Sequence, residues 1–119
     1  MIITLPWPPS GLSGHNNGSW KSKSGLVKRH RDWASKATLS AALGFILPDG
    51  DINTHVSFYP PNNRSDRLNY PNRMKPYFDG ISDALRVNDK RFDVPNYFVF
   101  PVSDNPRVVV EIECKLEAV

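Results

Sequence analysis

Three short stretches of the chain have the apolar or alternating pattern of β-strands. The first runs from Ile2 to Leu5 and is followed at once by prolines. In the second, Val56 and Phe58 alternate with His, Ser and Tyr up to the proline pair at 60–61. The third covers residues 107–116, where every second side chain is apolar. Because proline lacks the N–H that a sheet ladder needs, we expect the first two strands to end at these prolines.

Two further segments repeat apolar residues every three or four positions, which is the spacing of an amphipathic helix. This spacing predicts one helix from about Gly25 to Phe45 and a second from Pro71 to about Leu85, with the proline in its first turn. Residues 10–24 are rich in Ser, Gly and Asn and are expected to form a long loop. Residues 96–102 and 107–116 flank a turn-forming segment, so we expect them to pair as a hairpin.

The resulting order of elements is β-α-β-α-β-β. It predicts an α+β domain of two layers, in which two helices cover a mixed or mainly antiparallel sheet. The 119 residues match the length of one domain, so residues 1–119 are expected to form a single unit. A composition of 39% hydrophobic and 23% charged residues is typical of globular proteins and unlike that of disordered chains.

Cysteine content and hydropathy restrict the cellular setting that we expect. The single cysteine, Cys114, cannot form an internal disulfide, and zinc sites with several thiolates are excluded for the same reason. The first ten residues lack the positive charge and apolar run of a secretion signal, and no run of about 18 apolar residues follows. We therefore expect a cytoplasmic protein with no membrane partner.

Positive charge is concentrated in the first part of the chain. Overall, 15 Lys and Arg against 12 Asp and Glu give a net charge of +3, which permits an anionic partner without requiring one. Residues 1–46, however, hold six of these cations against one Asp, a local net charge of +5. A solvated helix face and a surface that contacts phosphates are both consistent with this pattern. The six cations are Lys21, Lys23, Lys28, Arg29, Arg31 and Lys36.

Aspartates gather in a second window. All three glutamates lie at or near the last strand, where alternate residues face water, and Asp49, Asp51 and Asp104 lie in turn-forming segments. Of the six remaining aspartates, five fall between positions 66 and 93 and are interleaved with Lys and Arg. These five are Asp66, Asp79, Asp83, Asp89 and Asp93.

Two interpretations of this window remain open. It is either an exposed helix with ion pairs such as Lys75 with Asp79, four residues apart, or a divalent-metal site that faces a phosphate. The second is chemically plausible because Mg²⁺ takes carboxylate oxygens, while neighbouring cations hold the polyanion that the acids would otherwise repel.

The order of motifs along nearly the whole chain favours the metal site. The sequence Leu5-Pro6-Trp7-Pro8-Pro9-Ser10 is followed by a Gly/Asn-rich loop and a basic helix, then by Pro60-Pro61, an Arg/Asp box, a helix with Lys and Asp, and Asn88-Asp89. This order resembles the RusA family of Holliday junction resolvases. The resemblance implies a small homodimer that binds four-way DNA junctions in recombination and repair. It also implies an endonuclease that nicks two opposed strands, with Mg²⁺ held by aspartates and an essential lysine nearby.

The resemblance assigns roles to individual residues. Asp66 and Asn69 match the first acid and the asparagine of the family's Asp-x-Asp-Asn box, and Lys75 matches its helix lysine. Asp89 matches the second acid of a later Asp-Asp pair, and Asp79 resembles an acid one helical turn after the lysine. The implied catalytic residues are therefore Asp66, Lys75 and Asp89, and the implied metal ligands are Asp66, Asp89 and Asp79. The implied DNA contacts are Lys21, Lys23, Lys28, Arg29, Arg31, Arg64, Arg67 and Arg73.

The chain departs from the family pattern at two acid positions, where it has Leu68 and Asn88. Leucine cannot ligate Mg²⁺, so Asp79 or Asp93 would have to replace the missing carboxylate. These departures support a second hypothesis, a junction-binding or architectural DNA-binding protein of the same fold with weakened catalysis. A third is a basic interaction module without a DNA role.

The motif also fits in a second register. Asn72-x-x-Lys75-x-x-Phe78-Asp79 has the compact spacing of the family motif, but it places Asn69 and Pro71 at the two acid positions. We therefore prefer the register that begins at Asp66.

The histidines and tryptophans give weaker signals. His15, His30 and His55 lack metal-ligand spacing and are interpreted as packing or surface residues, with His15 a candidate phosphate contact in its loop. Trp7 and Trp33 are expected in the core, whereas Trp20, in a polar segment, is a candidate for stacking on an unpaired base.

Overall fold

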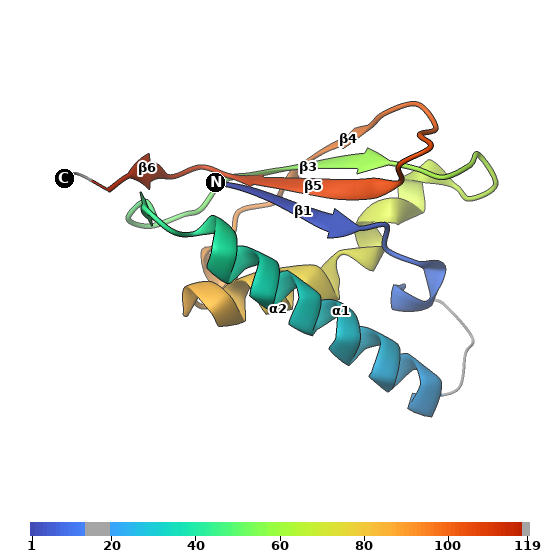
Figure 1. Cartoon of the computed structure of the whole chain (residues 1–119), viewed down its shortest axis with the longest axis horizontal. Coiled ribbons are helices and arrows are strands. Elements are labelled where there is room, and N and C mark those ends of the chain that lie inside the picture. The colour runs from blue at the N-terminus through green and yellow to red at the C-terminus, as the bar shows by residue number, and fades with distance from the viewer. Residues whose placement is uncertain (14–19, 118–119) are drawn as a thin grey trace.

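A computed structural model describes residues 1–13 and 20–117, without the side chains of residues 20–22. One layer is a four-stranded sheet, and the helices cover one of its faces (Figure 1). The strands lie in the order β1 (Ile2–Pro6), β5 (Arg107–Ile112), β3 (Thr54–Tyr59) and β4 (Asn96–Val99). The β3–β4 pair is parallel and the others are antiparallel. The predicted two-layer α+β fold with a mixed sheet is confirmed.

The other layer holds the two long helices, α1 (Trp20–Ala41) and α2 (Lys75–Leu85). Short 3₁₀ segments and a small second sheet connect the main elements. These are η1 (Ser10–Leu12), η2 (Arg67–Arg73) and η3 (Asp89–Arg91), and the antiparallel pair of β2 (Phe45–Ile46) with β6 (Lys115–Leu116). No helix in the described part of the chain is both long enough and apolar enough to cross a membrane.

The core lies between the sheet and the helices, where the alternation in the strand sequences predicts it. Ile3 and Leu5 of β1, and Val56 and Phe58 of β3, are almost completely buried, while their sequence neighbours face outward. Central β5 contributes Val108, Val110 and Ile112 in the same way.

Gly80 sets the distance between the two helices. A Cβ at this position would overlap the carbonyl oxygen of Arg31 and would lie 2.9 Å from the Cβ of Ala34. The backbone of α2 therefore rests directly on α1, an approach that only glycine permits.

A buried hydroxyl joins three elements. Tyr77 of α2 donates its single O–H proton to the carbonyl of Pro6 in β1 at 2.7 Å. It therefore accepts a hydrogen bond at 2.8 Å from Nδ1 of His30 in α1, and that nitrogen carries the proton. Burial, reinforced by Arg29, lowers the pKa of His30, and burial raises the pKa of Tyr77. The interpretation of His30 as a packing residue is confirmed.

Several predicted boundaries are wrong. Helix α1 begins at Trp20, inside the expected loop, and ends at Ala41. The predicted second helix is two elements, because η2 contains Pro71 and α2 starts afterwards with Pro76 in its first turn. Proline suits that position because the first helical N–H groups lack an intrahelical partner.

The predicted terminal hairpin is also wrong. Strands β4 and β5 do not pair with each other, because β3 lies between them and pairs with both. Trp33 is a second correction, since its side chain is 41% exposed and meets His30 edge-on at 4.8 Å between ring centroids. Trp7 does pack against the core, edge-on to Tyr70.

Candidate functional site

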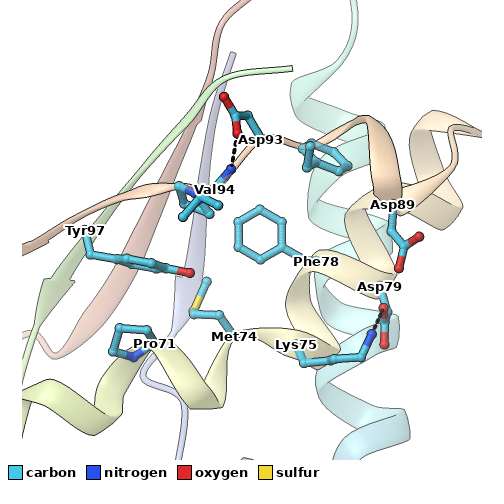
Figure 2. Close-up of a pocket in the computed structure, with 11 residues that line it drawn as sticks. Pro71, Met74, Lys75, Phe78, Asp79, Asp89, Asp93, Val94 and Tyr97 are labelled. Carbon is cyan, nitrogen blue, oxygen red and sulfur yellow. Dashed lines mark hydrogen bonds and ion pairs between the residues drawn. The ribbon is translucent and has the colours of Figure 1, made fainter. Parts of the chain in front are cut away.

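A pocket of about 330 Å³ lies between α2, η3 and the segment that leads into β4 (Figure 2). One side is apolar and includes Met74, Phe78 and Tyr97. The other side carries one cation and three acids of the aspartate-rich window, namely Lys75, Asp79, Asp89 and Asp93. Four charged residues predicted or considered for the site thus meet at one cavity.

Helix α2 presents two of these groups on successive turns. The Nζ atom of Lys75 lies 3.0 Å from Oδ1 of Asp79, an ion pair between residues four apart. The Lys75 side chain is 73% exposed and that of Asp79 is 23% exposed. The predicted pair is confirmed. The exposure of the Lys75 side chain also leaves its ammonium group accessible to a ligand in the pocket.

Asp89 reaches the same pocket because the chain reverses after α2. Arg86 adopts the left-handed conformation, with φ 55° and ψ 44°, and ends the helix. The Asn88 side chain then accepts a hydrogen bond from the Lys90 N–H and begins η3. The carboxylate of Asp89 points toward the Lys75–Asp79 pair in Figure 2. It has no hydrogen-bond or ion-pair partner in the described part of the chain.

Asp93 lines the pocket but directs its carboxylate elsewhere. Its Oδ1 accepts a hydrogen bond from the N–H of Val94 at 2.8 Å, and Figure 2 shows the group turned away from Asp79 and Asp89. Of the two acids considered as replacements for the missing carboxylate, Asp79 therefore has the more suitable position.

Asp66 lies outside this pocket. Its Oδ1 accepts a hydrogen bond from the N–H of Leu68 at 3.0 Å and caps η2. It lines a separate hollow with Asn63, Ser65 and Arg67. Within the described residues, no three His, Cys, Asp or Glu side chains converge closely enough to hold one ion. The implied set of Asp66, Asp79 and Asp89 is not brought together, although its last two members are.

The predicted DNA contacts differ in accessibility. The side chain of Lys21, like that of Trp20, is outside the described part of the structure, and so is all of His15. Lys28 and Arg29 on α1 are exposed, as are Arg64 and Arg67, and Lys23 is partly exposed.

Arg31 is also exposed but is paired. Its Nε and Nη2 donate to the two carboxylate oxygens of Asp83 at 2.7 and 2.9 Å, which links α1 to α2. The Asp83 hydrogen bond raises the pKa of Arg31, and the Arg31 hydrogen bond lowers the pKa of Asp83.

Arg73 does not belong to the accessible basic surface. It is only 6% exposed, and its Nη1 donates to the carbonyl of Pro8 at 3.1 Å. Its guanidinium carbon lies 5.2 Å from the ring centroid of Tyr70 and 6.0 Å from that of Trp7. Burial lowers the pKa of Arg73. This cation supports the fold, and as placed it is shielded from a DNA backbone.

Sequence reasoning missed the apolar half of the pocket. Met74 and Phe78 are on the predicted apolar face of α2, but nothing in the sequence distinguishes a pocket wall from the core. Tyr97 reaches the pocket because β4 pairs with β3, a long-range contact that the local pattern does not reveal.

No known protein-family model matches the chain. It is similar to an uncharacterised protein of Xylella fastidiosa (strain Temecula1), with 41% identity over 93 residues. The match covers 76% of this chain and 61% of the Xylella protein, so the chain spans less than two thirds of the length of that relative.

Proposed function

We propose that this protein is a Mg²⁺-dependent, structure-selective endonuclease that resolves four-way DNA junctions as a homodimer. The observation that carries the proposal is the single pocket lined by Lys75, Asp79 and Asp89, three polar groups that the RusA resemblance assigns to the chemistry. The exposed cations of α1, including Lys28 and Arg29, would contact the DNA backbone without reading sequence.

The donor atoms of the pocket fit a hard divalent cation. Mg²⁺ in phosphoryl-transfer sites usually takes one or two protein carboxylates and completes its shell with water and substrate oxygens. Asp79 and Asp89 supply two carboxylates to one cavity, and Asp89 has no competing partner within the described residues. When bound, Mg²⁺ would activate water and neutralise charge on the scissile phosphate.

The residues that line the pocket would have separate roles in the reaction. Asp79 and Asp89 would hold the cation, with Asp79 as the ligand that the pocket offers in place of Asp66. Lys75, three-quarters exposed beside them, stabilises the charge that develops on the phosphate or the leaving oxygen. The apolar wall at Phe78 and Tyr97 bounds the cavity on the side away from these charges.

The test is a cleavage assay on a synthetic four-way junction with Mg²⁺. We expect paired, symmetric nicks from the wild type, and loss of cleavage with retained junction binding in Lys75→Gln. The Lys90→Gln variant, which removes a nearby exposed cation outside the pocket lining, should cut normally. Absence of nicking by the wild type, or equal cutting by Lys75→Gln, would reject the catalytic proposal.

A second candidate function is junction binding with little or no cleavage. Two observations favour it: Asp66 is separate from the pocket, and the positions of the missing acids are taken by exposed Leu68 and by Asn88, which caps η3. This protein would bind junctions equally with and without Mg²⁺, and binding would weaken steeply as salt rises. Under this function, Leu68→Asp would create or raise cleavage.

A further inference from the structure

Strand β4 exposes an apolar edge without charge. Residues 94–102 contain no charged side chain, and β4 pairs with β3 on one side only in the described part of the chain. Edge strands of monomeric proteins are usually protected by charges, prolines, bulges, short length or a covering element. Strand β4 is short and lies between two prolines, yet its exposed side chains form an apolar patch without charge, and such a patch marks a protein-contact surface. The exposed apolar side chains are Val94, Tyr97, Phe98, Val99, Phe100 and Val102.

The backbone groups available at this edge can be identified. Phe100 donates its N–H to the carbonyl of Phe58 in β3 at 2.9 Å, so its backbone faces β3. Backbone groups alternate between the two sides of a strand. The N–H and C=O groups of Phe98 therefore also face β3, while those of Tyr97 and Val99 face outward.

Two prolines limit the length of the edge that can pair. Pro95 and Pro101 also fall at outward-facing positions, and neither has an N–H to donate. The segment between them is five residues long, 96–100, and its centre is Phe98.

We propose that β4 pairs antiparallel with β4 of a second copy, about a two-fold axis through Phe98. The inference rests on the homodimer of the proposed function and assigns its surface. In this register Tyr97 faces the partner's Val99, and both have outward backbone groups, so symmetry gives four hydrogen bonds. Phe98 faces the partner's Phe98 in a non-hydrogen-bonded pair, the kind that brings side chains closest. Each proline faces the partner's other proline, where the ladder ends.

A second copy fits this edge better than a nucleic acid does. The segment has no cation to hold a phosphate, whereas aromatic residues and the absence of charge characterise the centres of protein interfaces. The six exposed side chains present roughly 500 Å² per copy, so the side-chain area that two copies can bury has an upper bound of ~1,000 Å², the size at which specific interfaces begin. A two-fold interface must also be self-complementary, and the register about Phe98 meets that condition.

The pairing would place the two candidate sites symmetrically. Val94, Pro95 and Tyr97 form one wall of the pocket that holds Lys75 and Asp89. Each pocket would therefore border the seam between the copies, related by the same axis. A four-way junction has four strands, and its resolution nicks one opposed pair, so two symmetric sites match a substrate that is cut twice.

Disulfide trapping tests the register. Phe98→Cys in a Cys114→Ser background places two thiols in a non-hydrogen-bonded pair, where Cα atoms are about 4.5 Å apart and a disulfide can form. Asn96→Cys in the same background is the matched control, because the two copies of position 96 would lie about 13 Å apart. We expect a covalent dimer from the first variant only. Equal trapping, or trapping of position 96 alone, would overturn the register.

Sedimentation equilibrium tests the surface independently of catalysis. Phe98→Lys places like charges opposite each other, and we expect it to weaken dimerisation at least about 100-fold while the fold is retained. Ile2→Lys is the control, since Ile2 is an exposed residue of β1 at the opposite edge of the sheet. A wild type that remains a monomer would overturn both the interface and the dimer. A dimer that persists in Phe98→Lys would overturn only the interface. Neither mass measurement depends on junction cleavage, which tests the proposed function separately.

Discussion

Asp66 and Asp89 belong to the same acid-rich window of the sequence, yet the fold uses them differently. The carboxylate of Asp66 is engaged by the N–H of Leu68 and caps the 3₁₀ helix that follows. The carboxylate of Asp89 faces a pocket, without a partner within the described residues, and points toward Lys75 and Asp79. The difference lies in the backbone, since Asp66 precedes a helix start and Asp89 follows a reversal at Arg86. An acid is available for chemistry only where the local fold leaves it free.

We expect the largest effect in junction cleavage, where substitution of Asp89 and substitution of Asp66 should have very different results. Asp89→Asn should lower junction cleavage by on the order of 100-fold or more, because it removes charge from the proposed cation site. Asp66→Asn should change cleavage by less than about threefold, since asparagine also caps helices well. Cleavage rates at saturating Mg²⁺ measure both. The reverse order would move the catalytic centre to the hollow at Asp66.

The next effect concerns the packing that holds the pocket in place. Gly80→Ala puts a methyl group against the backbone of α1, so we expect a loss of about 3 kcal/mol in the free energy of unfolding. Gly25→Ala is the matched control, because Gly25 also lies in a helix, α1, but a Cβ there would have no atom within 4 Å. It should raise stability by up to about 1 kcal/mol. Urea denaturation distinguishes the two, and a neutral Gly80→Ala would contradict the close approach.

A smaller difference between Asp66 and Asp89 is expected in their contributions to the free energy of unfolding. Asp66→Ala removes a helix cap and should cost about 1 kcal/mol, whereas Asp66→Asn should cost little. Asp89→Ala should not lower stability, because its carboxylate makes no bond within the described part of the fold. Thermal melts of the three variants test the contrast. Destabilisation by Asp89→Ala would show that this acid also supports the fold.

The smallest effect is on pH dependence. The folded state lowers the pKa of His30, so the unfolded chain binds a proton first as pH falls. The contribution of His30 is therefore complete above about pH 6.5 and is lost as pH falls from there through the lower, folded pKa. Asp83 also has a lowered pKa, but its contribution is lost only near pH 4 and below. His30→Gln should flatten the melting temperature between pH 7 and 5, while Asp83→Asn should leave that range unchanged.

Periodicity predicted most elements because burial imposes it directly. The alternation at Val56 and Phe58 and the face of α2 that carries Ile81 reflect which side chains leave water. Hydrophobic periodicity could not predict which strand β4 pairs with. Its strand pattern is the same whether the partner is β5 or β3, and only the long-range packing selects β3 in parallel.

The candidate site was predictable in part for a similar reason. Sequence spacing alone predicts the contact between Lys75 and Asp79, because residues four apart in a helix are neighbours. The position of Asp89 depends on a left-handed Arg86, a residue type that seldom adopts this conformation and gives no warning of it. The burial of Arg73 was equally unpredictable, because its environment comes from Trp7, Pro8 and Tyr70 together.

The position of β5 has a consequence for how the protein is made. This strand pairs with both β1 and β3, yet it comes last of the four strands in the chain. During synthesis β1 and β3 have no strand between them until residues 107–112 leave the ribosome. The helices can form early because their hydrogen bonds are local, but the sheet closes only once β5 has emerged. Until then β1 has no paired strand and β3 can pair only with β4, so the nascent chain is most vulnerable to aggregation and proteolysis.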